Sequence, residues 1–200
     1  MATPDALRRD LEAEIEGEIR FDRVSRALYS SDASVYQIEP LGVVIPRTRP
    51  DIVRTVEIAR RHGCSITARG GGTSQAGQAI GAGLVVDTSK FFNHVLEVNA
   101  RERWARVEPG VVLDHLNLAL RPEGLRFAPD ISTASRATIG GMIANNSSGA
   151  RSVLYGKTID HVLELTVVLA DGRVTTFKAL DPHELDEKCR QDSLRHVKRA

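Results

Sequence analysis

The 200-residue sequence predicts an α+β fold with two lobes, each built on a small mixed sheet flanked by helices. Strand, helix and strand patterns follow one another between residues 41 and 68. Alternating hydrophobic segments that suit antiparallel hairpins lie at residues 94–110 and 163–177. With 42% hydrophobic and 26% charged residues, the chain can bury one good core or two small ones.

The first 30 residues are expected to form an N-terminal helical segment. Thr3 and Pro4 suit an N-cap and a first helical turn, and Gly17 can end the helix. The apolar stripe of this helix consists of Ala6, Leu7, Leu11 and Ile15. The segment is too charged for a signal peptide, and no apolar run reaches membrane-spanning length, so we expect a cytoplasmic protein.

The first lobe is predicted over residues 31–99. "LGVVIP" suits a strand, a helix begins near Pro50 and ends at Gly63, and "CSITA" suits a second strand. This makes a βαβ unit, and "GLVVDTSK" adds another strand. A glycine-rich loop follows the second strand, where open α/β layers place their ligands.

The second lobe is predicted over residues 100–180. "HVLEVN" and "RWARVEPG" suit antiparallel partners, and a helix ends before Pro122 and Gly124. The apolar stripe of that helix is Val112, Leu113, Leu116 and Leu120. "LELTVVLADGRVTTF" suits a β-hairpin whose turn contains Asp171 and Gly172. Residues 181–200 are charged, and we expect them to be the start of a truncated downstream region.

Composition excludes several classes of function. The net charge is +1, from 27 basic and 26 acidic residues. The chain therefore has no excess of positive charge that would attract a nucleic acid backbone. Cys64 and Cys189 are too few for a disulfide scaffold or a four-cysteine metal site and suit a reducing compartment. His94, His115 and His161 lack the spacing of metal ligands, so no metal site is predicted.

The stretch "ITARGGGTSQAGQ", residues 66–78, contains three adjacent glycines that are costly to order. It offers consecutive backbone N–H groups without Cβ atoms, two hydroxyls and the guanidinium of Arg69, which together suit a pyrophosphate. A mobile glycine turn with a solvated arginine is the alternative.

Familiar phosphate and hydrolase motifs do not fit. The G-x-G-x-x-G fingerprint fails because Val86 stands where its last glycine would be. The G-K-T run at residues 156–158 is no Walker loop because Arg151 occupies the position of the first glycine. A nucleophile elbow would need glycine at Asn145.

The second glycine-rich stretch is "RATIGGMIANNSSG", residues 136–149. Thr138 suits the N-cap of a short helix whose first turn contains Gly140 and Gly141, where a ligand could approach the N–H groups. Two loops suited to anions predict one large ligand with a diphosphate, bound between the lobes.

Together, "ARGGGTSQAGQ" and "APDISTASRATIGGMIANNSSGARSVLYGKTIDHVLELTVVLADG" resemble the FAD-binding PCMH-type domain of the vanillyl-alcohol oxidase and p-cresol methylhydroxylase superfamily. The resemblance runs from about Ser30 to Phe177. It is greatest to the FAD-linked dehydrogenases of D-lactate, glycolate and D-2-hydroxyglutarate, particularly the long bacterial type with a C-terminal iron–sulfur region.

The resemblance implies a set of FAD-binding residues in the two loops. They are Arg69, Gly70, Gly71, Gly72, Thr73, Ser74, Gly77 and Gln78 in the first, and Pro129, Thr138, Gly140, Gly141, Asn145, Ser148, Gly149, Gly156 and Val162 in the second. Asn145 and Asn146 could instead hold loop backbone, and Tyr155 and Trp104 suit packing positions.

The implied activity is oxidation of a small D-2-hydroxy acid by hydride transfer to the flavin. Substrate-binding arginines and the histidine that accepts the hydroxyl proton would belong to a downstream cap domain, so residues 1–200 alone are expected to be inactive. Some members of the family that the chain resembles link FAD covalently through a histidine in the glycine loop. This chain has no histidine between His62 and His94, so FAD would be non-covalent. The alternatives are a stand-alone FAD-binding module or subunit, and a reductase of cell-wall aminosugar synthesis.

Overall fold

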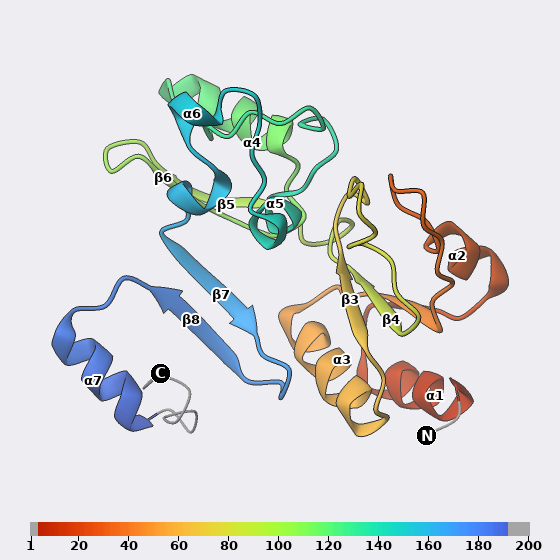
Figure 1. The fold of residues 1–200 in the computed structure, drawn as a ribbon. Coiled ribbons are helices and arrows are strands. Elements are labelled where there is room, and N and C mark those ends of the chain that lie inside the picture. The colour runs from red at the N-terminus through yellow and green to blue at the C-terminus, as the bar shows by residue number, and fades with distance from the viewer. Residues whose placement is uncertain (1–3, 192–200) are drawn as a thin grey trace.

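The computed structural model describes residues 4–191, and Figure 1 shows two lobes. The first lobe consists of α1 (Pro4–Glu14), β1 (Glu18–Arg20), α2 (Arg23–Leu28), β2 (Gly42–Ile45), α3 (Arg49–Arg61), β3 (Ile66–Arg69) and β4 (Leu84–Asp87). The second lobe consists of β5 (Val95–Asn99), β6 (Trp104–Val107), α4 (Leu113–Leu120), η1 (Arg121–Glu123), α5 (Ile139–Asn145), α6 (Ser152–Tyr155), η2 (Thr158–His161), β7 (Glu164–Val168) and β8 (Val174–Lys178). Helix α7 (Pro182–Gln191) follows.

The first lobe is built on a four-stranded mixed sheet with the order β1-β2-β4-β3. Strands β2, β4 and β3 are parallel, and β1 runs antiparallel to β2. The predicted strand, helix and strand unit is confirmed as β2, α3 and β3, but β4 lies between its two strands. Every residue of β2 and β4 is buried, as expected for central parallel strands.

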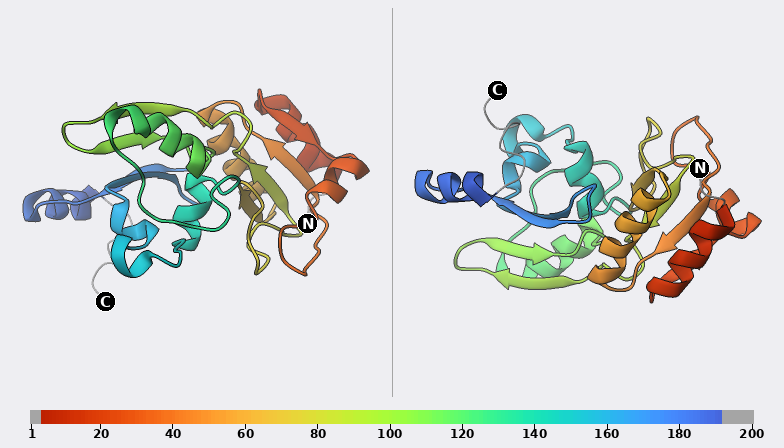
Figure 2. Two further views of the ribbon diagram at one scale, coloured as in Figure 1. Left: turned by 90° about the horizontal axis from the view of Figure 1, so that it is seen from above. Right: turned by 90° about the horizontal axis from the view of Figure 1, so that it is seen from below.

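The two faces of this sheet are covered by different elements. Val44 and Leu84 pack with residues of α1 and α3, which lie side by side in Figures 1 and 2. Val43 and Val85 point to the opposite face and pack with Tyr29 and Phe91. The alternation of side chains along β2 and β4 thus places one cluster on each face.

Local capping signals account for the bounds of α3. Thr48 is the N-cap and forms a capping box with Asp51, and the chain leaves the helix through Gly63 at φ +61°. Asp51 also accepts hydrogen bonds from the backbone N–H groups of Glu16 and Arg47, at 3.1 and 2.8 Å. One buried carboxylate therefore joins the end of α1 to the start of α3.

The second lobe contains two separate antiparallel hairpins, β5–β6 and β7–β8, so the structure has three sheets where the sequence predicted two. Neither hairpin sheet is mixed, because each pairs only strands that adjoin in sequence. The predicted antiparallel pairing of residues 94–99 with residues 103–110 is confirmed as β5 and β6. The predicted turn at Asp171 and Gly172 is confirmed, with Gly172 at φ +88°. Val111, Leu116 and Met142 are buried in the core of this lobe.

The N-terminal segment differs from the prediction at one element. Residues 18–20 form β1, although no strand was expected there, and they pair with β2. Leu7 and Leu11 lie in the core of the first lobe, as their predicted stripe required. The predicted N-cap at Thr3 and the tail from residue 192 lie outside the described residues, and the predicted domain boundaries stay predictions. No helix within residues 4–191 has the length and apolar character needed to cross a membrane.

Candidate cofactor site

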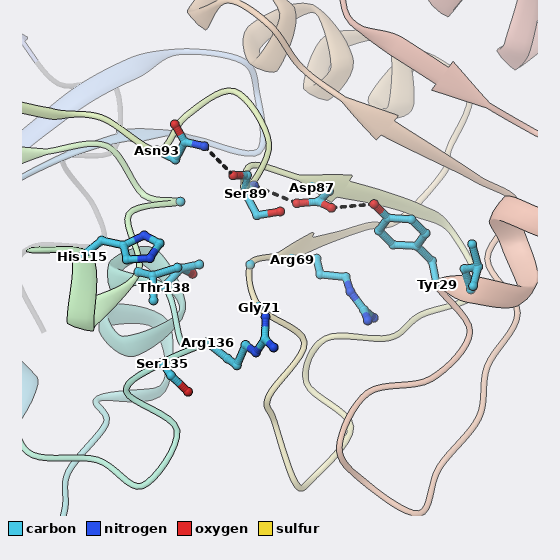
Figure 3. A pocket seen from close by; sticks show the side chains of 14 residues that line it. Tyr29, Arg69, Gly71, Asp87, Ser89, Asn93, His115, Ser135, Arg136 and Thr138 are labelled. Carbon is cyan, nitrogen blue, oxygen red and sulfur yellow. Dashed lines mark hydrogen bonds between the residues drawn. The ribbon is translucent and has the colours of Figure 1, made fainter.

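A cleft of about 690 Å³ lies between the lobes, and Figure 3 shows it from close by. The first lobe contributes the carboxyl ends of β3 and β4, which adjoin because the two strands are parallel and paired. The second lobe contributes the start of α4 and the loop before α5. The lining residues are Leu28, Tyr29, Arg69, Gly70, Gly71, Asp87, Ser89, Asn93, Gly110, Val112, His115, Ser135, Arg136 and Thr138.

The glycine loop, residues 69–78, touches the loop that precedes α5, residues 128–138, here called the α5 loop. A Cβ atom added at Gly70 would lie 2.0 Å from Thr138 Oγ1, and one added at Gly71 would lie 2.2 Å from the carbonyl oxygen of Arg136. Real Cβ atoms essentially never approach so closely. Two of the three adjacent glycines are therefore required by contact between the lobes, a role that the sequence did not reveal.

The backbone donors of the glycine loop remain open. In the part of the chain that the structure describes, the N–H groups of residues 70–74 donate to no protein acceptor. Neighbouring groups are satisfied: Ser74 Oγ accepts from the N–H groups of Ala76 and Gln78, both at 3.3 Å. The carbonyl of Gly72 accepts from Ala33 N at 3.1 Å. A run of unsatisfied N–H groups beside a cleft suits an anionic ligand.

The first turn of α5 differs from the prediction. Thr138 is the N-cap, as expected, and its hydroxyl accepts from Gly141 N at 3.4 Å. The N–H groups of Ile139 and Gly140, however, donate at 2.8 Å to the carbonyls of Val111 and Pro109. These donors already have protein partners, so the expectation of free N–H groups at this helix start is wrong. These N–H groups bind the segment before α4, at Pro109 and Val111, instead of remaining open to a ligand.

Arg69 is the first residue of the glycine loop, and its side chain contacts other groups of the first lobe. Its Nη1 donates to the carbonyl of Ala79 at 3.0 Å, and its guanidinium lies over the ring of Tyr29, 5.2 Å from the centroid. The Tyr29 hydroxyl in turn donates to Asp87 Oδ2 at 2.6 Å. Burial, and then the bond to Asp87, raises the pKa of Tyr29. Asp87 Oδ1 accepts from Ser89 N at 2.8 Å, so this buried carboxylate is bonded at both oxygens.

Of the predicted FAD-binding residues, Arg69, Gly70, Gly71 and Thr138 line the cleft. Several others stabilise the loops of the second lobe. Asn145 Nδ2 donates to the carbonyl of Gly141 at 3.1 Å, and Gly149 lies so close to Asp130 that an added Cβ would be 1.4 Å from its carbonyl oxygen. Gly156 adopts φ +77°.

The remaining predicted residues are not among those that line the cleft: Gly72, Thr73, Ser74, Gly77, Gln78, Pro129, Gly140, Gly141, Asn145, Ser148, Gly149, Gly156 and Val162. Their contact with FAD stays a prediction. Sequence reasoning missed other lining residues, among them Tyr29, Asp87, Ser89, Asn93 and Arg136. Asp87 carried a signal, since it ends a strand and open α/β sheets bind ligands beyond the carboxyl ends of their strands. Within residues 4–191, no group of three His, Cys, Asp or Glu side chains is placed to hold a metal ion.

The chain belongs to a family of FAD-binding domains: the family described as "FAD binding domain" matches residues 40–178. Over 176 residues the chain is 44% identical to the D-2-hydroxyglutarate dehydrogenase of Pseudomonas putida, covering 86% of this chain and 18% of that protein. It is 37% identical to the glycolate oxidase subunit GlcD of Bacillus subtilis, covering 80% and 35%. It is 39% identical to the D-lactate dehydrogenase of Archaeoglobus fulgidus, covering 68% and 30%. The chain thus spans well under half the length of each of these relatives.

Solved structures show the same fold. An alkyldihydroxyacetonephosphate synthase superposes with a TM-score of 0.78 at 22% identity, covering 93% of this chain and 37% of that one. The carbohydrate oxidase from Microdochium nivale superposes with a TM-score of 0.72 at 26% identity, covering 89% and 38%. The predicted α+β fold, the PCMH-type family and FAD as the cofactor are thereby confirmed.

Proposed function

We propose that the chain is the FAD-binding domain of a flavin-dependent dehydrogenase that oxidises a small D-2-hydroxy acid. The names of its relatives support this class, because they refer to D-2-hydroxyglutarate, glycolate and D-lactate. The observation that carries the proposal is the row of N–H groups at residues 70–74, which have no protein acceptor among the described residues and lie beside an interlobe cleft.

The residues present fit the cofactor. The open N–H groups of the glycine loop would hold the diphosphate, because consecutive backbone donors without Cβ atoms form a concave anion site. Thr138 is buried against Gly70 and forms part of the opposite wall of the cleft. When bound, FAD supplies a hydride acceptor for the oxidation of the hydroxy acid. The chain itself would bind and orient the cofactor.

Attachment is proposed to be non-covalent, since the glycine loop has Thr73 and Ser74 and contains no histidine. Residues that hold the substrate carboxylate and accept the hydroxyl proton are proposed to come from a separate substrate domain. The electron acceptor could be an iron–sulfur region, as in the long bacterial enzymes that the sequence resembles.

A second candidate is an FAD-binding module or subunit that turns over no substrate until a partner supplies the substrate domain. The names of the glycolate oxidase relatives favour it, because each is called a subunit. Co-purification with a partner, followed by a turnover assay of the complex, distinguishes this candidate from a single-chain enzyme.

Titration of the 200-residue chain with FAD and FMN tests the proposed function. FAD should bind more tightly, because FMN lacks both the second phosphate and the adenosine that an interlobe cleft can hold. Flavin fluorescence and calorimetry measure the two affinities, with riboflavin as the phosphate-free control. Equal affinities for FAD and FMN would contradict the assignment of the glycine loop to the diphosphate.

A further inference from the structure

The cleft contains two arginines, one from each lobe. Arg69 ends β3, and Arg136 lies in the α5 loop (Figure 3). Because a diphosphate is anionic, the guanidinium that is not already held by protein groups is the better candidate to bind it. The partners of the two side chains therefore decide which arginine has this role.

Arg69 is held by the protein. Its guanidinium donates to the carbonyl of Ala79 and lies over the ring of Tyr29, 5.2 Å from the centroid. It also fills the space beside Gly72, where an added Cβ would lie 2.6 Å from Arg69 Nη2. Since Arg69 begins the glycine loop and Ala79 directly follows it, this hydrogen bond closes the loop and sets its shape.

Arg136 has a fixed backbone and an open side chain. Its N–H donates to the carbonyl of Thr133 at 2.8 Å, and its carbonyl oxygen lies against Gly71. Within residues 4–191, its guanidinium makes no hydrogen bond, ion pair or ring contact. The side chain is exposed and turns toward the glycine loop (Figure 3). A fixed backbone therefore presents an available cation beside open N–H groups.

The carboxylates of Asp87 and Asp130 already have hydrogen-bond or ion-pair partners. Among its lining residues Asp87 is the one acid, and both its oxygens are hydrogen-bonded, to Tyr29 and Ser89. Asp130, in the α5 loop, pairs with Arg151 at 2.6 Å. His115 lies on the wall formed by α4. The balance of charge thus leaves the guanidinium of Arg136 available for an anionic ligand.

We infer that Arg136, and not Arg69, supplies the cation that binds the FAD diphosphate, while Arg69 is a positioning residue that shapes the glycine loop. The inference rests on the proposed function. An arginine can donate two parallel hydrogen bonds to phosphate oxygens, which a lysine cannot reproduce. The N–H groups of residues 70–74 and the Arg136 guanidinium would then meet the same anionic group from two lobes.

The test measures FAD binding by the 200-residue chain, and ADP binding by competition, for Arg136→Gln, Arg136→Lys, Arg69→Gln and the control Arg101→Gln. Arg101 is an exposed arginine in the turn between β5 and β6, away from the cleft. Arg136→Gln should weaken FAD and ADP alike by about 10- to 100-fold, the range of a hydrogen bond to a charged group. Arg136→Lys should lose less, and Arg101→Gln should bind like the wild type.

Thermal unfolding without ligand separates binding from positioning. Arg136→Gln should keep the wild-type Tm, whereas Arg69→Gln should lower it, because that change removes contacts inside the first lobe. FAD and ADP affinities of Arg136→Gln within about twofold of the wild type would overturn the inference. So would a loss confined to FAD, since ADP carries the same diphosphate. A wild-type chain that does not bind FAD would instead contradict the proposed function on which the inference rests.

Discussion

Replacing Gly71 by alanine tests whether contact between the two loops holds the cleft together. The added Cβ would lie 2.2 Å from the carbonyl oxygen of Arg136 and 3.0 Å from its carbonyl carbon. These are backbone atoms, so no side chain can rotate away from the new methyl group. To restore a separation of 3.0 Å, the glycine loop and the α5 loop must move apart by roughly 0.8 Å.

Forcing a methyl group into a packed contact costs typically about 1–3 kcal/mol. In a domain of this length each kcal/mol lowers Tm by about 2–4 °C, so the variant should melt lower by between about 2 and 12 °C. The displaced loop also carries the N–H groups proposed to hold the diphosphate, so FAD affinity should fall along with stability. Gly71 does not have a positive φ, so alanine can adopt its backbone conformation and the effect reports the contact alone.

Thermal unfolding followed by circular dichroism, together with FAD titration, measures both effects. Gly141→Ala is the matched control, because its Cβ would meet its nearest neighbour, Thr138 Oγ1, at 3.3 Å. Alanine inside a helix also gains about 0.5–1 kcal/mol over glycine. Because the 3.3 Å contact is tight but involves one side-chain atom and no backbone, the control should lose less stability than Gly71→Ala. If Gly71→Ala melts and binds FAD like the wild type, the loop contact does not organise the cleft and this reasoning is wrong.

Three further predictions concern pH, cofactor attachment and turnover. Burial opposes ionisation of Asp51, but hydrogen bonds from the backbone N–H groups of Arg47, Glu16 and Thr48 outweigh it and hold the pKa of Asp51 below its usual value. Its contribution to stability is therefore present above about pH 4 and lost as pH falls through the lowered pKa. Asp51→Asn should be less stable than the wild type in urea at pH 7, with a smaller difference at pH 3. FAD should leave the protein on acid precipitation, and flavin absorbance retained by the pellet would contradict non-covalent binding. The 200-residue chain loaded with FAD should show no anaerobic flavin bleaching by D-lactate, D-2-hydroxyglutarate or glycolate, because the arginines of its cleft are assigned to phosphate or to the loop; bleaching by any of the three would refute this.

Features that depend on a few neighbouring residues could be predicted from the sequence. Pro50 and Gly63 marked the two ends of α3, because the residues that begin and end a helix act within one turn of chain. Gly172 marks the turn of the β7–β8 hairpin for the same local reason. The residues of the glycine loop suited a pyrophosphate, and the structure leaves the N–H groups of residues 70–74 without acceptors among the described residues.

Contacts between segments distant in sequence were decided only by the tertiary structure. The sequence showed that the first turn of α5 is small and capped by Thr138, but Gly140 N donates to Pro109, a partner that no local pattern identifies. Likewise β4 enters between β2 and β3, which aligns Asp87 with Arg69 and builds the first wall of the cleft.

The two arginines illustrate the same division. The sequence by itself determined that Arg69 leads the glycine loop and that Arg136 precedes the cap of α5. Only packing decided that Arg69 turns inward to Ala79 and Tyr29, while Arg136 reaches toward the glycine loop. The physical reason is that a side chain's hydrogen-bond partners and burial depend on which distant backbone lies beside it, and sequence spacing carries no information on that placement.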